Sequence, residues 1–226
     1  MNRVLRSYGL PRHEWLRAAF IACAALCALP GSVLAQATGP GLMDRQKETA
    51  LALSACPPAV AEKAGVYVLE ANGYVKVRDS QNGFTAIVQH SLPTSVEPRC
   101  MDAEGTRTHL PRILKVAELR AQGKSREEIQ RFVADAFAQG VFQPPTRPGV
   151  DYMLSTENLV PDDKGVVAPF PPHVMFYAPY LTNADLGSDG QTGGGPAFVA
   201  AAGTPYALII VPVGSAPIHK HPDGSQ

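Results

Sequence analysis

Hydrophobic residues in the first third of the chain beyond residue 43 recur at helical spacing. Ala50, Leu51 and Leu53 lie on one side of a predicted helix over about 45–54, and Asp44 is placed to cap its first turn. Pro57 and Pro58 end this segment. Because proline is accepted in a first helical turn, we expect a short second helix from residue 58 to near residue 65.

Three stretches rich in β-branched and aromatic residues follow, at 66–70, 74–78 and 84–90. Their connections, 71–73 and 79–83, each contain an Asn-Gly pair, which supplies the positive φ angles of tight turns. The pattern predicts a three-stranded antiparallel β-meander at about 66–90. Val75 and Val77 alternate with polar residues, so one face of this sheet is expected to contact water.

An αα-hairpin is predicted at about 109–139. Its first helix has apolar residues at helical spacing from Leu110 to Ala117, and Gly123 suits the turn. Ser125 and Glu128 form a capping box for a second helix over about 126–139. The apolar stripe of this second helix predicts packing against a core.

The last third is rich in proline and glycine, which excludes long helices. Apolar stretches at 152–154, 174–177 and 206–213 predict strands, and 185–196 predicts a loop. The order of helices, strands, helices and strands predicts one α+β domain over 44–213. We expect a flexible segment at 36–43 and a disordered tail at 214–226.

The N-terminus has the order of a secretory signal peptide. Four arginines precede twelve consecutive apolar residues, 18–29, and small residues follow Pro30. We expect cleavage of a signal peptide, residues 1–35, after Ala35 or alternatively after Ala37. The alternative is retention as an anchor, although twelve residues of helix span only about 18 Å of a hydrocarbon core of roughly 30 Å. The predicted location is the periplasm or the exterior, with no membrane span after cleavage.

Charge changes the picture once this segment is removed. The whole chain balances 20 basic against 20 acidic residues, whereas residues 36–226 hold 16 and 19, a net charge of −3. No basic excess of the kind that binds nucleic acid is present, so no nucleic-acid partner is expected.

Two cysteines, Cys56 and Cys100, lie beyond the signal peptide. In an oxidising compartment an isolated pair predicts a disulfide, which stabilises by roughly 4 kcal/mol on the chain-entropy model. A catalytic or metal-binding thiol is the alternative, but no C-x-x-C spacing supports it.

Three stretches, 73–79, 82–84 and 173–179, resemble those of a family of exported bacterial proteins without an assigned function. The resemblance covers roughly residues 43–213. It implies export, and it implies no substrate, cofactor or catalytic residue.

Motifs of known chemistry are missing from the sequence: it has no nucleophile elbow, zinc-protease helix, Walker loop or dinucleotide fingerprint. His219 and His221 could share a metal, but a third ligand is lacking, so we predict neither a metal site nor a cofactor. The segment 185–190 has the wrong residues for an EF-hand, and a looser calcium loop is left open.

The segment 170–185 concentrates aromatic and polar groups beside the glycine-rich loop, as small-ligand pockets do. Alternation places His173, Met175 and Tyr177 on one face of a strand. The candidate ligand-binding residues are His173, Tyr177, Tyr180, Asn183 and Asp185. The alternative is a half-buried strand whose polar groups bond to backbone.

Two functions follow from this reading. The first is an exported, non-catalytic envelope protein that binds a small molecule or a partner protein. The alternative is an enzyme of undescribed type that uses His173 as general acid or base with Tyr177 or Asp185.

Overall fold

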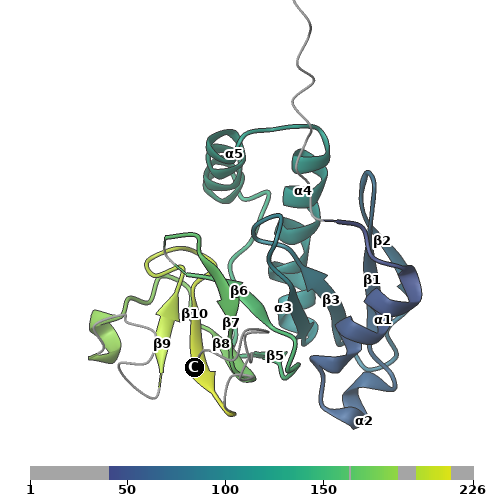
Figure 1. Ribbon diagram of the computed structural model, residues 1–226. Helices are drawn as coiled ribbons and strands as arrows, with labels where there is room; N and C mark the ends of the chain where they lie inside the picture. The colour runs from purple at the N-terminus through teal and green to yellow at the C-terminus, as the bar shows by residue number, and fades with distance from the viewer. Residues whose placement is uncertain (1–40, 163, 188–196, 215–226) are drawn as a thin grey trace, which may run out of the picture. The chain divides into compact units, whose positions relative to one another are not determined.

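The computed structural model describes residues 41–162, 164–187 and 197–214. The elements, in chain order, are α1 Arg45–Ser54, α2 Pro58–Ala61, β1 Gly65–Glu70, β2 Gly73–Arg78, β3 Thr85–Gln89, β4 Glu97–Met101, α3 Ala103–Thr108, α4 Leu110–Ala121, α5 Arg126–Ala138, β5 Val150–Met153, β6 Leu159–Pro161, β7 Val167–Pro169, β8 His173–Tyr177, the 3₁₀ turn η1 Ala184–Leu186, β9 Phe198–Ala200 and β10 Leu208–Pro212. The predicted α+β class is confirmed (Figure 1). The predicted signal peptide, most of the flexible segment and all but the first residue of the predicted tail lie outside the described residues.

Eight strands form one mixed sheet in the order β2-β1-β3-β4-β5-β8-β10-β9, and β6 and β7 pair separately. The three strands predicted at 66–90 exist, but the predicted meander is wrong. β3 lies parallel to β1, on the opposite side of β1 from β2. The reason is burial: residues 85–88 of β3 are all buried, so this strand needs a neighbour on each side, whereas β2 exposes Lys76 and suits an edge. Asn82 binds the carbonyl of Val60 at 2.9 Å instead of closing a hairpin.

The two faces of the sheet carry different cores. Val66, Val68, Ala86, Val88 and Cys100 face α1. The residues next to them in the strands point to the opposite face. There Tyr67, Ile87 and Met101 pack with Leu110 and Ile113 of α4. The predicted disulfide is confirmed: Cys56 and Cys100 are bonded, with Cα atoms 5.2 Å apart, and they join the chain after α1 to β4.

The αα-hairpin is confirmed as α4 and α5, and both halves of the capping box between Ser125 and Glu128 are present. Helix α5 packs on α4 through Ile129 and Val133, which meet Val116 and Leu119, and Tyr206 joins this cluster. Figure 1 shows the two helices beside each other at the top of the view. Their junction is one wall of the candidate site.

Strands β5, β8 and β10 confirm the predicted C-terminal strands, and the sequence missed β4, β6, β7, β9 and α3. In β4, Pro98 is tolerated because β5 pairs only with Cys100 and Met101, so Pro98 lies outside that ladder. Within the described part of the chain, no helix has both the length and the apolar character needed to cross a membrane.

Candidate functional site

The strand alternation predicted for β8 is confirmed, and it buries two of the candidate residues. His173 is 2% exposed, and its Nδ1 lies 2.8 Å from the carbonyl oxygen of Pro171. Burial lowers the pKa of His173 to about 4, so the ring is neutral at neutral pH. No hydrogen bond or ion pair among the described residues joins His173 to a carboxylate. The geometry therefore offers the proton-transfer alternative no support.

Tyr177 is also buried, and its hydroxyl donates to the carbonyl of Val150 at 3.0 Å. Its ring stacks on His109 with centroids 4.8 Å apart. Burial raises the pKa of Tyr177 above its ordinary value, so the phenol stays protonated. The contacts of Tyr177 are those of a structural side chain that joins β8 to the start of β5 and to the residue before α4.

The three remaining candidates lie after β8. The side chain of Asn183 accepts from the amide of Val199 at 2.7 Å and donates to its carbonyl at 3.1 Å. It therefore pairs with the backbone of β9. Asp185, inside η1, accepts from the amide and hydroxyl of Thr182, which precedes that turn. Only Tyr180, which is 60% exposed, lines one of the three cavities described below. The structure therefore does not bring the five candidates together.

His219 and His221 lie outside the described residues, as do residues 188–196 of the predicted loop. Within the described ranges, no three His, Cys, Asp or Glu side chains gather as a metal-binding set.

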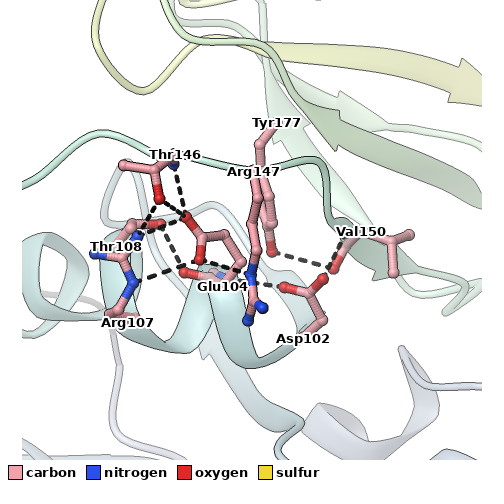
Figure 2. Close-up of polar contacts among 9 residues, drawn as sticks. Asp102, Glu104, Arg107, Thr108, Thr146, Arg147, Val150 and Tyr177 are labelled. Atoms are coloured by element: carbon pink, nitrogen blue, oxygen red, sulfur yellow. Dashed lines mark hydrogen bonds and ion pairs between the residues drawn. The ribbon is translucent and has the colours of Figure 1, made fainter.

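A saturated carboxylate network joins α3 to the chain before β5 (Figure 2). Glu104 is 2% exposed; its carboxylate accepts from Arg107 at 2.6 Å, from Arg147 at 3.1 Å and from the amide of Thr146 at 2.7 Å. Burial opposes the charge, but the Thr146 amide and the two arginines outweigh it, so the pKa of Glu104 is lowered. Asp102 completes the join by accepting from the amides of Gly105 and Val150. These groups already have their partners, which marks the network as structural.

A second buried charge pair lies on the face of the sheet that α4 covers. Arg99 and Asp151 are 4% and 0% exposed and bond to each other, and Arg99 also donates to Gln89 at 2.7 Å. Next to them His109 is buried with no hydrogen-bond partner for either ring nitrogen in the described residues. Burial, with Arg99 and Arg112 nearby, holds the pKa of His109 well below its ordinary value. The core beneath α4 is therefore polar. It also holds the carboxylate of Glu97, which accepts from Ser91 and Ser95 and whose negative charge partly opposes the lowering of the pKa of Arg112 and Arg120.

Two arginines on one side of α4 have no carboxylate partner. Arg112 and Arg120 are both partly buried, and neither makes an ion pair with a described residue. Arg120 donates to the carbonyls of His90 and Ser91. Arg112 lies over the ring of Tyr206, 4.3 Å from its centroid, and its buried Nε has no partner among the described residues.

These arginines border a cleft between α4 and α5, hereafter the α4–α5 cleft, with a volume of about 600 Å³. Its apolar surface comes from Val116, Ile129, Val133 and Tyr206, and the turns around Leu92 and Asp162 close its sides. Its charged groups are Arg112, Arg120, Lys124, Arg126 and the single acid Asp162. Lys124 pairs with Glu128 at 3.0 Å, which leaves the three arginines as its unpaired cations within the described residues.

The same two arginines also line a smaller cavity of about 300 Å³ on the other side of α4, between α4 and the β1–β2 turn. This α4–β2 cavity is mainly apolar and carries Glu70 as well. The cleft has more positive charge and more room, so it is the better place for an anion.

Electrostatics make Arg112 the central residue of the α4–α5 cleft. Burial, with Arg99 nearby, lowers the pKa of Arg112 to about 10, so the guanidinium is still charged at neutral pH. A desolvated cation with no carboxylate in contact is energetically unfavourable, and the charge of Glu97 offsets only part of this cost for Arg112. A bound carboxylate or phosphate would remove this cost, because guanidinium groups bind such oxygens through paired hydrogen bonds.

The spacing of residues in the predicted helix over the first half of the αα-hairpin already indicated that the two arginines lie on the same side. Arg112, Val116 and Arg120 recur every four residues, so they lie on one stripe of the predicted helix. Charged residues on such a helix are usually solvated, and only the position of α5 and Tyr206 turns this stripe toward a cavity.

Fold and site together define an α+β domain with a mixed sheet and a cleft, basic and apolar, under a helical hairpin. Comparison of the chain with protein-family models, with curated proteins and with solved structures found no match.

Proposed function

We propose that this protein is exported and binds a small organic anion, without catalysis, in the α4–α5 cleft. The observation that carries the proposal is the pair Arg112 and Arg120, partly buried on the cleft wall with no described carboxylate partner. A structural role for a buried cation calls for a counterion within the fold, as Glu104 has. These two arginines make no ion pair with a described carboxylate, and Glu97 acts on them only at longer range, so a bound anion is the natural contact partner.

The size and surface of the cleft support a ligand with an apolar part. About 600 Å³ falls in the range of small-molecule sites, which combine apolar walls with a few placed polar groups. Val116, Ile129 and Val133 would contact the apolar part while the arginines hold the acid group. A positive cleft on a chain whose residues 36–226 carry a net charge of −3 also favours anion entry at that place.

Isothermal titration with simple probes tests the proposal. We expect hexanoate and hexyl phosphate to bind the protein at pH 7, and hexanol to bind much more weakly. Arg112→Gln should weaken both anions at least tenfold, because a charge-assisted hydrogen bond contributes about 1.5–3 kcal/mol and tenfold corresponds to about 1.4 kcal/mol. Gln130→Glu, which adds a negative charge on the exposed cleft rim without changing side-chain size, should weaken them as well.

Arg131→Gln is the matched control, because Arg131 is an exposed arginine of α5 outside the α4–α5 cleft. It should leave the affinity for hexanoate unchanged. Equal affinity for hexanol and hexanoate would contradict the proposal, and so would anion binding that survives both Arg112→Gln and Arg120→Gln.

Export rests on the order of charged, apolar and small residues in 1–37. The Cys56–Cys100 disulfide supports it, since disulfides persist in oxidising compartments. Intact mass measurement of protein recovered from the cell envelope tests it. We expect the mass of residues 36–226 or 38–226 less two hydrogens; the full-length mass with free thiols would contradict export.

A further inference from the structure

A third cavity adjoins the α4–α5 cleft. It has a volume of about 370 Å³ and lies between α5 and the chain around Tyr180 and Thr204. Three residues, Gln130, Val133 and Tyr206, line both this Tyr180 cavity and the cleft. The two cavities therefore adjoin, with Tyr206 and Val133 between them and the exposed Gln130 on their common rim.

Aromatic groups lead from the arginines to this cavity. Arg112 lies over Tyr206, and Tyr206 stacks on Phe137 of α5 with centroids 5.6 Å apart. Both Phe137 and Tyr206 line the Tyr180 cavity, and Tyr180 adds a third ring. Apart from Gln130 and Thr204 the lining is apolar, and it contains no charged side chain. Such a surface suits an uncharged ring that stacks on aromatic side chains.

The backbone of Tyr180 supplies an independent observation. Tyr180 has φ +67°, a conformation that side chains other than glycine rarely adopt, and yet its side chain is 60% exposed. The conformation is held by the Tyr180 amide, which donates to the carbonyl of Thr204 at 2.8 Å. Packing of the ring does not explain why a large aromatic residue occupies this position. Strained residues presented at a cavity are typical of binding sites.

We infer that the Tyr180 cavity is a second subsite for the same ligand and that it receives a ring. The ligand class is an organic acid that carries its carboxylate or phosphate at one end and an aromatic or sugar ring at the other. The acid group binds at Arg112 and Arg120, and the ring stacks on the exposed Tyr180 and contacts Phe137 and Tyr206 from the side. This inference rests on the proposed function, because it uses the α4–α5 cleft as the anion site.

Matched probes test the ring subsite. In titrations at pH 7, 6-phenylhexanoate should bind at least tenfold more tightly than hexanoate if the ring is aromatic. If the ring is a sugar, glucose 6-phosphate should bind at least tenfold more tightly than inorganic phosphate. Either gain supports the inference and identifies the ring. Tyr180→Ala should remove the gain and leave the affinity for hexanoate or phosphate unchanged.

Two further variants separate binding from folding. Tyr180→Gly should also lose the gain, while it raises Tm by about 2–4 °C because glycine accepts the positive φ. Phe176→Ala, at an aromatic residue that is 45% exposed and lines none of the three cavities, should change neither affinity nor gain.

The possible failures are distinguishable. If the simple anions bind through Arg112 but a ring adds nothing in either series, or if the gain survives Tyr180→Ala, the ring subsite is overturned and the proposed function stands. If no anion binds, both fail.

Discussion

The network around Glu104 and the arginines of α4 are two answers to the same problem, a charge taken out of water. Glu104 is nearly inaccessible, and its carboxylate receives two arginines and a backbone amide (Figure 2). Arg112 and Arg120 are partly buried and receive no carboxylate from the described chain. In the first cluster the fold pairs the charge with opposite charges, whereas in the second it supplies two backbone carbonyls to Arg120 and a cavity beside both arginines.

This difference gives a criterion for separating charges that the fold pairs from charges that, as we propose, a ligand pairs. A saturated cluster contributes to stability, and removing its centre leaves donors without partners. A cluster whose charges lack partners and lie beside a cavity contributes little to stability, and it is stabilised only when a ligand binds. The two clusters should therefore respond in opposite ways to substitution.

Substitution of Glu104 should give the largest effect on stability. Glu104→Ala leaves Arg107, Arg147 and Thr146 without their carboxylate acceptor and should lower the free energy of unfolding by about 3 kcal/mol at pH 7, measured by urea denaturation. Because the folded-state pKa of Glu104 is lowered, the loss should shrink as pH falls below about 4.5.

The affinity for hexanoate should not change in the folded Glu104→Ala variant. Arg112→Gln should show the reverse pattern, with weakened binding and a stability change of less than about 1 kcal/mol. A large loss of stability in Arg112→Gln would remove the distinction between the clusters.

The next largest effect on stability is expected from Gly105→Ala, because Gly105 packs closely against Tyr177 beside the Glu104 network. A Cβ at position 105 would lie 1.9 Å from the Tyr177 hydroxyl oxygen and 2.7 Å from its Cζ. Gly105→Ala must therefore displace Tyr177 from Val150 and His109, at a cost of about 2 kcal/mol. Thermal unfolding of Gly105→Ala, Tyr177→Phe and the double variant measures the coupling. If the losses of stability in Gly105→Ala and Tyr177→Phe were strictly additive in the double variant, the contacts of the Tyr177 hydroxyl would not depend on Gly105.

The smallest effect is expected for Glu48, a carboxylate that is buried as Glu104 is but that has no cationic partner among the described residues. Glu48 is 1% exposed and accepts from the amide of Leu69 at 2.8 Å, with no ion pair among the described residues. Burial raises its pKa from 4.5 to about 7. The stability contributed by the protonated carboxyl is therefore fully present below pH 4.5 and is lost as pH rises through 7.

Glu48→Gln should consequently raise the free energy of unfolding at pH 8 by about 1 to 2 kcal/mol. The advantage over the original chain should shrink as pH falls from 7 to 4.5 and vanish by roughly pH 3.5, about one unit below the ordinary pKa, where the carboxyl is neutral in both states. Urea denaturation at the two pH values measures it, and an advantage that is the same at both would show that Glu48 is not buried as a charge.

Local signals in the sequence were sufficient for several parts of the fold. The Asp44 cap and the Ser125–Glu128 capping box define helix starts because their bonds join residues two or three apart. Glycine with positive φ at 123 and 140 ends the helices for the same local reason. The pairing of Cys56 with Cys100 was predicted because they are the two cysteines beyond the proposed signal peptide.

The sequence was a poorer guide to the site. Alternation correctly placed His173 and Tyr177 on one face of β8, but it could not tell whether that face meets a cavity or a core. It meets a core. Tyr180 was among the predicted residues and does line a cavity, whereas Arg112 and Arg120 were not singled out, because charges on a helix usually face water.

The sequence by itself determined the longer helices, several of the strands, the disulfide pair and the export signal that we propose, because each depends on residues close together or on a simple count. Only the tertiary structure decided that β1 separates β2 from β3, that Arg99 meets Asp151, and that α5 and Tyr206 enclose the arginines of α4. Those outcomes join residues tens of positions apart, and they depend on which faces must be buried together rather than on any local pattern.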